Sequence, residues 1–106
     1  MEALSATLHA IADPTRRAII DRLTRGPARI TDVAAPFAMS LAAVSKHLKV
    51  LERAGLVRRT RQGREHSIAL EAAPLRAVAS WAAPFEQYWT ERLDRLEAYF
   101  KTRTPR

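Results

Sequence analysis

Apolar residues recur at helical spacing through the first quarter of the chain and are interrupted by two short polar breaks. Three of them share one face of a predicted first helix over about residues 2–12: Leu4, Leu8 and Ile11. Asp13-Pro14 predicts the N-cap and first residue of a second helix, because the Asp side chain accepts unpaired N–H groups and proline has no N–H to leave unpaired. The apolar side of this helix consists of Ala18, Ile19, Ile20 and Leu23. Gly26-Pro27 predicts its end.

Two shorter amphipathic segments follow, separated by a turn. Ile30 is predicted to be a short extended residue, and Thr31 to cap a brief third helix with the apolar residues Val33, Ala34 and Phe37. A turn at Ala38-Met39 leads to Ser40, the predicted N-cap of a fourth helix. Its apolar residues lie three and four positions apart: Leu41, Val44, Leu48 and Leu51. Gly55 is predicted to close this helix at its C-cap.

The apolar period then changes from helical to strand-like. Residues 56–61 and 65–70 predict two strands joined by a turn at residues 62–64, whose sequence is Gln-Gly-Arg. Val57, Ile68 and Leu70 are predicted to pack against the helices. That orientation leaves the arginines of the hairpin facing solvent.

A long apolar stripe at steps of three and four residues predicts a last helix that starts near Pro74. Its members are Leu75, Val78, Ala82, Phe85, Trp89, Leu93, Leu96 and Phe100. Pro84 lies inside this stripe, and proline removes the backbone hydrogen bond to residue 80. A kink or a restart of the helix is therefore expected at this position.

The predicted order of elements is four helices, a hairpin and a final helix. Two short helices joined by a tight turn and followed by a basic hairpin are typical of the winged helix-turn-helix arrangement. The fold class is therefore mainly α with a small β-hairpin, with about five helices plus a two-stranded wing. At 106 residues, the chain is expected to form a single domain over residues 1–106.

The net charge of the chain and its distribution indicate what kind of partner it binds. The chain has 18 Lys and Arg against 11 Asp and Glu, a formal net charge of +7. Residues 57–70 contain four arginines and one glutamate, whereas residues 71–106 carry six bases and five acids. A basic chain of this size indicates a polyanionic partner, most often nucleic acid; the alternative is a basic surface kept for solubility.

The fourth helix is the candidate recognition helix. With its apolar stripe facing inward, a rotation of about 100° per residue places Ala42 and Lys46 on the opposite face and Lys49 near it. Lys46 is expected to donate to a guanine edge, whereas His47 either contacts a phosphate or packs against the protein. The predicted DNA-contacting residues are Ser40, Ala42, Ala43, Ser45, Lys46, His47 and Lys49. The alternative is an ordinary amphipathic helix with solvated lysines.

The hairpin is the candidate wing. Its predicted DNA-contacting residues are Arg59, Arg61, Gly63 and Arg64. The arginines are expected to straddle phosphates or enter a minor groove, and Gly63 allows the positive φ that a hairpin tip requires. A solvated run of charges is the alternative. Further candidates for backbone contacts, with no orientation fixed by the sequence, are Arg16, Arg17 and Arg29.

Six of the seven aromatic residues lie in the last helix, which indicates that the apolar face of this helix is buried against another surface. In a small monomer this helix and the first one would leave a large exposed apolar patch, and a two-fold dimer is the simplest way to bury it. The terminal helices, over about residues 2–12 and 75–101, are therefore the predicted dimerisation elements. The predicted interface residues are Leu4, Leu8, Ile11, Phe85, Trp89, Leu93, Leu96 and Phe100. A ligand or cofactor pocket among these aromatic residues is the less favoured interpretation.

Several function classes are disfavoured by composition. The chain has no cysteine, and its three histidines, His9, His47 and His66, fall in three different predicted elements, so no metal site or cofactor is expected. Three glycines in total leave no glycine-rich phosphate loop, and an enzyme is not expected. No signal peptide and no stretch of about 18 apolar residues is visible, which makes a cytoplasmic, non-membrane location the expectation.

Three segments resemble the ArsR-type winged-helix repressors. They are Ala12 to Arg17, the segment Ser40 to Leu51 (SLAAVSKHLKVL) with its continuation Glu52 to Val57, and the Gly63-Arg64 wing tip. The resemblance covers roughly residues 5–100. It implies a homodimer that binds an operator with inverted half-sites, is displaced by a signal and pairs through its first and last helices.

The chain departs from the metal-sensing pattern of that family. Where many members carry a cysteine pair, its third helix reads Thr31 to Ala35 (TDVAA), and its last helix has no histidine. The chain therefore resembles the cysteine-free, non-metal-sensing members, whose inducer is of unknown chemistry.

The expected function is that of a sequence-specific regulator of transcription, a repressor that binds double-stranded DNA as a homodimer. The first alternative is a winged-helix module for protein–protein assembly without specific DNA binding; Lys46, Lys49 and the wing arginines argue against it. RNA binding is a further alternative, disfavoured because the proposed surface has no aromatic residues on which bases would stack.

Overall fold

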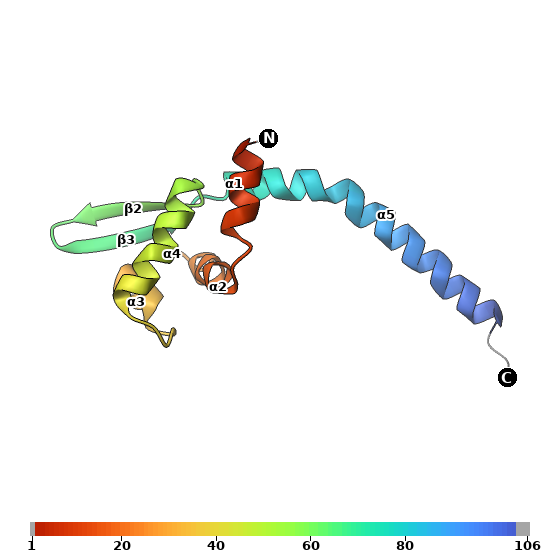
Figure 1. The fold of residues 1–106 in the computed structure, drawn as a ribbon, viewed down its shortest axis with the longest axis horizontal. Helices are drawn as coiled ribbons and strands as arrows, with labels where there is room; N and C mark the ends of the chain where they lie inside the picture. The colour runs from red at the N-terminus through yellow and green to blue at the C-terminus, as the bar shows by residue number, and fades with distance from the viewer. Residues whose placement is uncertain (1, 104–106) are drawn as a thin grey trace.

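The protein is described here from a computed structural model of residues 2–103, which places five helices and three strands around a small core (Figure 1). In chain order the elements are α1 (Glu2–Ala10), α2 (Pro14–Leu23), β1 (Ala28–Arg29), α3 (Ile30–Ala34), α4 (Leu41–Arg53), β2 (Val57–Gln62), β3 (Glu65–Leu70) and α5 (Ala73–Arg103). The predicted winged helix-turn-helix order of elements is confirmed.

Side-chain caps define where α2 and α4 begin, as the sequence predicted. The Arg16 N–H donates to Asp13 Oδ2 at 3.0 Å, and the Ala43 N–H donates to Ser40 Oγ at 3.1 Å. At the other end of α4, Gly55 has a φ of 74°, one residue after the C-cap Ala54. A left-handed glycine at this position stops the helix and turns the chain into β2.

The segment before α4 differs from the prediction. The first helix ends at Ala10 and not near residue 12. Ile30 is the first residue of α3, Thr31 lies inside that helix, and the residue at the N-cap, Arg29, makes no side-chain cap. The extended residues are Ala28–Arg29 and not Ile30, because Ala28 and Arg29 pair with β3. This strand joins partners about 40 residues apart, which local spacing does not reveal.

The predicted two-stranded wing is confirmed as the β2–β3 hairpin. The short strand β1, which was not predicted, adds a third antiparallel strand, so the sheet has the order β1-β3-β2. Gln62 pairs with Glu65, so the hairpin loop consists of Gly63 and Arg64 alone. Gly63 has a φ of 63° at the first loop position, where a type II′ turn requires glycine. The β2–β3 hairpin projects from one side of the body, away from α5 (Figure 1).

The core lies between α2, α3, α4 and the inner face of the sheet. Its fully buried large residues are Ile19, Val33, Val44, Leu48, Leu51, Leu56 and Ile68. Of the predicted core residues, Ala18 is exposed on α2 and Leu41 is 47% exposed. Leu41 is the first residue of α4, and the buried stripe of that helix begins one turn later at Val44. Phe37 packs against the core from the turn after α3, and not from inside the helix.

The last helix, α5, runs without interruption through Pro84, so of the two predicted alternatives, a kink or a restart, the structure excludes the restart. Figure 1 shows that the helix changes direction along its length, as expected when a proline removes one backbone hydrogen bond. Beyond its first turns, α5 projects away from the body (Figure 1). The radius of gyration is accordingly 19.2 Å, against about 13 Å for a compact chain of this length. No helix within residues 2–103 has an apolar stretch long enough to cross a bilayer.

Candidate nucleic-acid interface

The outer face of α4 carries the residues that the helical rotation assigned to it. The side chains of Ala42, Lys46 and Lys49 are exposed, and the N-cap Ser40 is exposed beside them. Ala43, Ser45 and His47 are half-buried at the flanks. The side chains on this face are small and uncharged at the start of the helix and basic along its middle. This pattern lets backbone approach a groove while the lysines reach its edges or phosphates.

The tip of the wing is basic and exposed. Arg61 and Arg64 are both exposed and flank Gly63, and the Arg61 Nε donates to the Gly63 carbonyl at 2.8 Å. That hydrogen bond folds the arginine over the turn. It places the guanidinium at the end of the hairpin and not along its side.

Arg59 does not face solvent, contrary to the expectation for the hairpin arginines. Its side chain is 20% exposed, and its Nε lies 2.9 Å from Glu52 Oε1 of α4. The reason is the two-residue period of a strand: Arg59 lies on the same side of β2 as the buried Val57 and so points toward the helix. Because the buried Arg59 nitrogens form no aligned hydrogen bond, the contact is ionic. It connects the wing to the last turn of α4.

The exposed cations of α4, the three strands and the hairpin loop divide into two groups. Arg29 and Arg58 each lie 3.2 Å from a carboxylate, of Glu65 and Glu71 respectively. By contrast, no carboxylate of the described residues lies within ion-pair distance of five cations: Lys46, Lys49, Arg53, Arg61 and Arg64. Arg58 is an exposed hairpin cation that the predicted site did not include, although its place in the basic run signals it.

His47 faces the start of α2 and not the outer face of α4. Its Nδ1 lies 3.7 Å from Asp13 Oδ2. The pKa of Asp13 is lowered, first by the hydrogen bond from the Arg16 N–H and further by the positive charges of His47 and Arg16, against an opposing effect of burial. Of the two alternatives for His47, this position favours packing over a phosphate contact. The 34-residue separation of His47 and Asp13 gave no sequence signal for it.

Two arginines considered for DNA contacts instead complete the end of α1. The Arg16 side chain donates to Ala10 O at 2.6 Å and to His9 O at 3.1 Å, and Arg17 donates to Ile11 O at 2.8 Å. The last carbonyl groups of a helix have no partner within it, so these bonds satisfy them. Together with Asp13 and His47, they connect the end of α1 to α4.

The predicted dimer-interface residues of α5 are exposed in the isolated chain. Phe85, Trp89, Leu93, Leu96 and Phe100 are each about half exposed or more. On α1, Leu4 and Leu8 are half-buried, whereas Ile11 packs partly against the core of its own chain. An exposed apolar face of this extent is unusual for a monomer.

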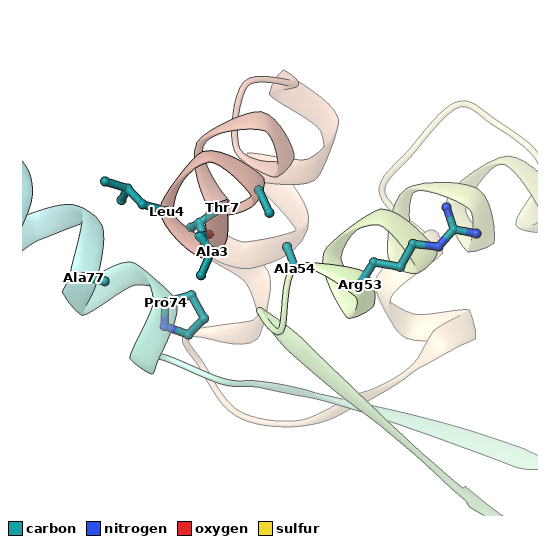
Figure 2. Close-up of a pocket in the computed structure, with 8 residues that line it drawn as sticks. Ala3, Leu4, Thr7, Arg53, Ala54, Pro74 and Ala77 are labelled. Atoms are coloured by element: carbon teal, nitrogen blue, oxygen red, sulfur yellow. The ribbon is translucent and has the colours of Figure 1, made fainter. Parts of the chain in front are cut away.

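A cavity of about 210 Å³ lies where α1, the end of α4 and the start of α5 meet. Its walls come from small side chains, chiefly Ala3, Ala54, Pro74 and Ala77 (Figure 2). Figure 2 also shows that the Arg53 guanidinium points away from this space. The cavity therefore offers no charged group to a ligand.

Comparison with known proteins places the chain among regulators of transcription. A helix-turn-helix domain family matches residues 11–60, from the end of α1 to β2. The HTH-type transcriptional regulator Rv2034 of Mycobacterium tuberculosis is 38% identical over 84 residues, which cover 79% of this chain and 76% of Rv2034. The transcriptional repressor SdpR of Bacillus subtilis is 34% identical over 76 residues, 72% of this chain and 84% of SdpR.

Solved structures agree. The ArsR family transcriptional regulator RHA00566 has a TM-score of 0.77 and 43% identity, covering 84% of this chain and 92% of that one. A homodimeric winged helix-turn-helix DNA-binding domain of Mycobacterium bovis, described as a possible ArsR-family regulator, has a TM-score of 0.63 and 26% identity, covering 89% and 84% of the two chains.

Proposed function

Because this chain belongs to the ArsR family of winged helix-turn-helix transcriptional regulators, we propose that it binds an inverted-repeat DNA operator as a homodimer and represses transcription by occupying it. The observation that carries the proposal is the set of exposed cations without carboxylate partners on α4 and at the wing tip. Their charge is available to phosphates and base edges. The homodimeric relative from Mycobacterium bovis and the repressor SdpR support the dimer and the repression.

In this proposal each part of the molecule has one role. The outer face of α4 enters the major groove, with Lys46 at a base edge, and Arg61 and Arg64 hold the flanking backbone. Arg59 and His47 position the wing and α4 from within the protein. The chain forms a single domain, and its terminal helices form the interface between two copies. We propose no catalytic role, and a cytoplasmic location follows from the DNA partner.

Substitutions are expected to separate the two kinds of DNA contact. Lys46→Ala should weaken operator binding by about 1–3 kcal/mol and relax the base preference at one position of each half-site. Arg61→Ala and Arg64→Ala should weaken binding to all sequences alike and lower the salt dependence, because each removes a phosphate contact. Titration of each variant against the operator and its single-base variants measures both effects. Equal weakening on every sequence by Lys46→Ala would show that Lys46 contacts only phosphate.

No metal ion is expected to control DNA binding. Residues 2–103 hold no group of three His, Asp or Glu side chains placed to bind a metal, and the chain has no cysteine. Zinc, copper, cadmium or arsenite added at one equivalent should leave the protein on its operator in a gel-shift or anisotropy assay. Stoichiometric zinc binding that releases the DNA would contradict this prediction and would point to a site shared between two copies, for example through His9.

A further inference from the structure

The apolar face of α5 is wide and almost continuous. Eight exposed large side chains form it: Trp81, Phe85, Tyr88, Trp89, Leu93, Leu96, Tyr99 and Phe100. At about 100° per residue, they fall within an arc of about 140° of the helix. The acidic residues of α5 between residues 81 and 100 lie outside that arc. A second copy of the chain is the occupant that the homodimeric relative supports.

Between residues 81 and 100, Arg92 is the one charged residue inside this arc, about 40° from the edge that Tyr88 forms. Its guanidinium carbon lies 4.2 Å from the centroid of the Tyr88 ring, at the distance of a cation–π contact. The Tyr88 ring in turn meets Trp89 edge to face, with 5.7 Å between centroids. The guanidinium is therefore held against the Tyr88 ring, at one edge of the apolar face.

Arg92 has no acid to neutralise it within its own helix. The residues three and four positions away are Tyr88, Trp89, Arg95 and Leu96. No carboxylate among residues 2–103 lies within ion-pair distance of it. Covering this face with a purely apolar surface would bury an unpaired charge, which costs several kcal/mol. A register that places the two Arg92 side chains of a symmetric pair opposite each other would add like-charge repulsion.

We propose that Arg92 is the specificity residue of the self-association surface: it restricts the second copy to the register in which both guanidinium groups reach acids at the edge of the partner face. The charge also prevents further copies from stacking on the remaining apolar arc. The same use of one polar residue within an apolar seam fixes register and oligomeric state in coiled coils. This inference rests on the proposed homodimer.

The first test is the size distribution of full-length Arg92→Leu in sedimentation velocity. Wild type is expected to form a single dimer, Arg92→Leu to shift toward species larger than the dimer, and Arg92→Lys to remain a dimer. Arg76→Leu is the matched control, because Arg76 lies on the opposite face of the same helix and is also exposed. A monomeric wild type would refute the proposed homodimer itself, whatever the variants do.

The second test reads the register directly and uses the absence of native cysteine. Single cysteines at Ala82, Leu93 and Leu96 are cross-linked by oxidation in wild-type and Arg92→Leu backgrounds. The proposal predicts one dominant cross-linked position in wild type and a spread over several positions in Arg92→Leu. A dimeric wild type whose Arg92→Leu form keeps the same size and the same cross-link pattern would overturn the role of Arg92 and leave the homodimer standing.

Discussion

Replacing Trp89 and Leu93 together with glutamate is expected to convert the protein into a monomer and to reduce operator binding to the level of non-specific DNA. The two side chains are 59% and 60% exposed in the isolated chain, about midway along the length of the apolar face between residues 81 and 100. Burying a large apolar side chain contributes roughly 1.5–3 kcal/mol, so two per subunit account for much of a dimer. Because a single recognition helix contacts too few base pairs to be selective, the affinity of the monomer for the operator should fall by about 10³-fold or more.

Sedimentation and operator titration of the same preparation measure this result. The matched control carries Gln87→Glu and Thr90→Glu, which add the same charge to the opposite, exposed side of α5. That control should remain a dimer and bind DNA. The account is wrong if wild type is monomeric at micromolar concentration, or if the Trp89 and Leu93 variant is monomeric and still binds its operator tightly.

Operator binding is also expected to weaken steeply with salt, by about 10³- to 10⁵-fold between 50 and 200 mM if a dimer makes about six to ten phosphate contacts. Lys49, Arg61 and Arg64 are exposed in each subunit, have no carboxylate within ion-pair distance among the described residues, and can supply such contacts. Each phosphate contact releases a condensed counterion, and added salt opposes that release. Fluorescence anisotropy over a series of salt concentrations gives the slope.

Two variants check this slope, one at the wing tip and one on α5. Arg64→Ala should lower it by about one unit per contact removed in each half-site, whereas Arg76→Ala, on α5, should leave it unchanged. Binding that is insensitive to salt over this range would contradict the electrostatic part of the account. It would leave base-edge contacts as the only source of affinity.

Local chemistry predicted most of the fold. Asp13 and Ser40 cap their helices because a short side-chain oxygen can reach an N–H three residues on, and that rule needs no tertiary information. The positive φ of Gly63 was likewise predictable, since that conformation favours glycine at a hairpin tip. The length of the loop was not, because Gln62, predicted to lie in the turn, pairs with Glu65. By contrast, β1 forms only because Ala28 and Arg29 meet β3, and no local pattern contains that pairing.

The candidate site shows the same division. Counting residues around α4 predicted the exposed Lys46 and Lys49, because the buried stripe fixes the rotation of the helix. The basic charge of the hairpin predicts Arg59 on the solvent side, whereas the strand alternation from Val57 points it toward α4. The alternation prevails because Glu52 of α4 provides a partner for the charge. The contact of His47 with Asp13 depends on how α4 crosses α2, which spacing alone does not determine.

Selection of bound sequences from random double-stranded DNA with the purified protein tests the central claim most directly. The account predicts enrichment of an inverted repeat whose half-sites are centred about 10–10.5 base pairs, or a multiple of this, apart, because two recognition helices related by a two-fold axis enter successive major grooves. Lys46→Ala should enrich the same repeat with one degenerate position in each half-site. Failure to enrich any sequence, or enrichment of a single half-site without symmetry, would contradict the claim that this protein is a dimeric, sequence-specific regulator.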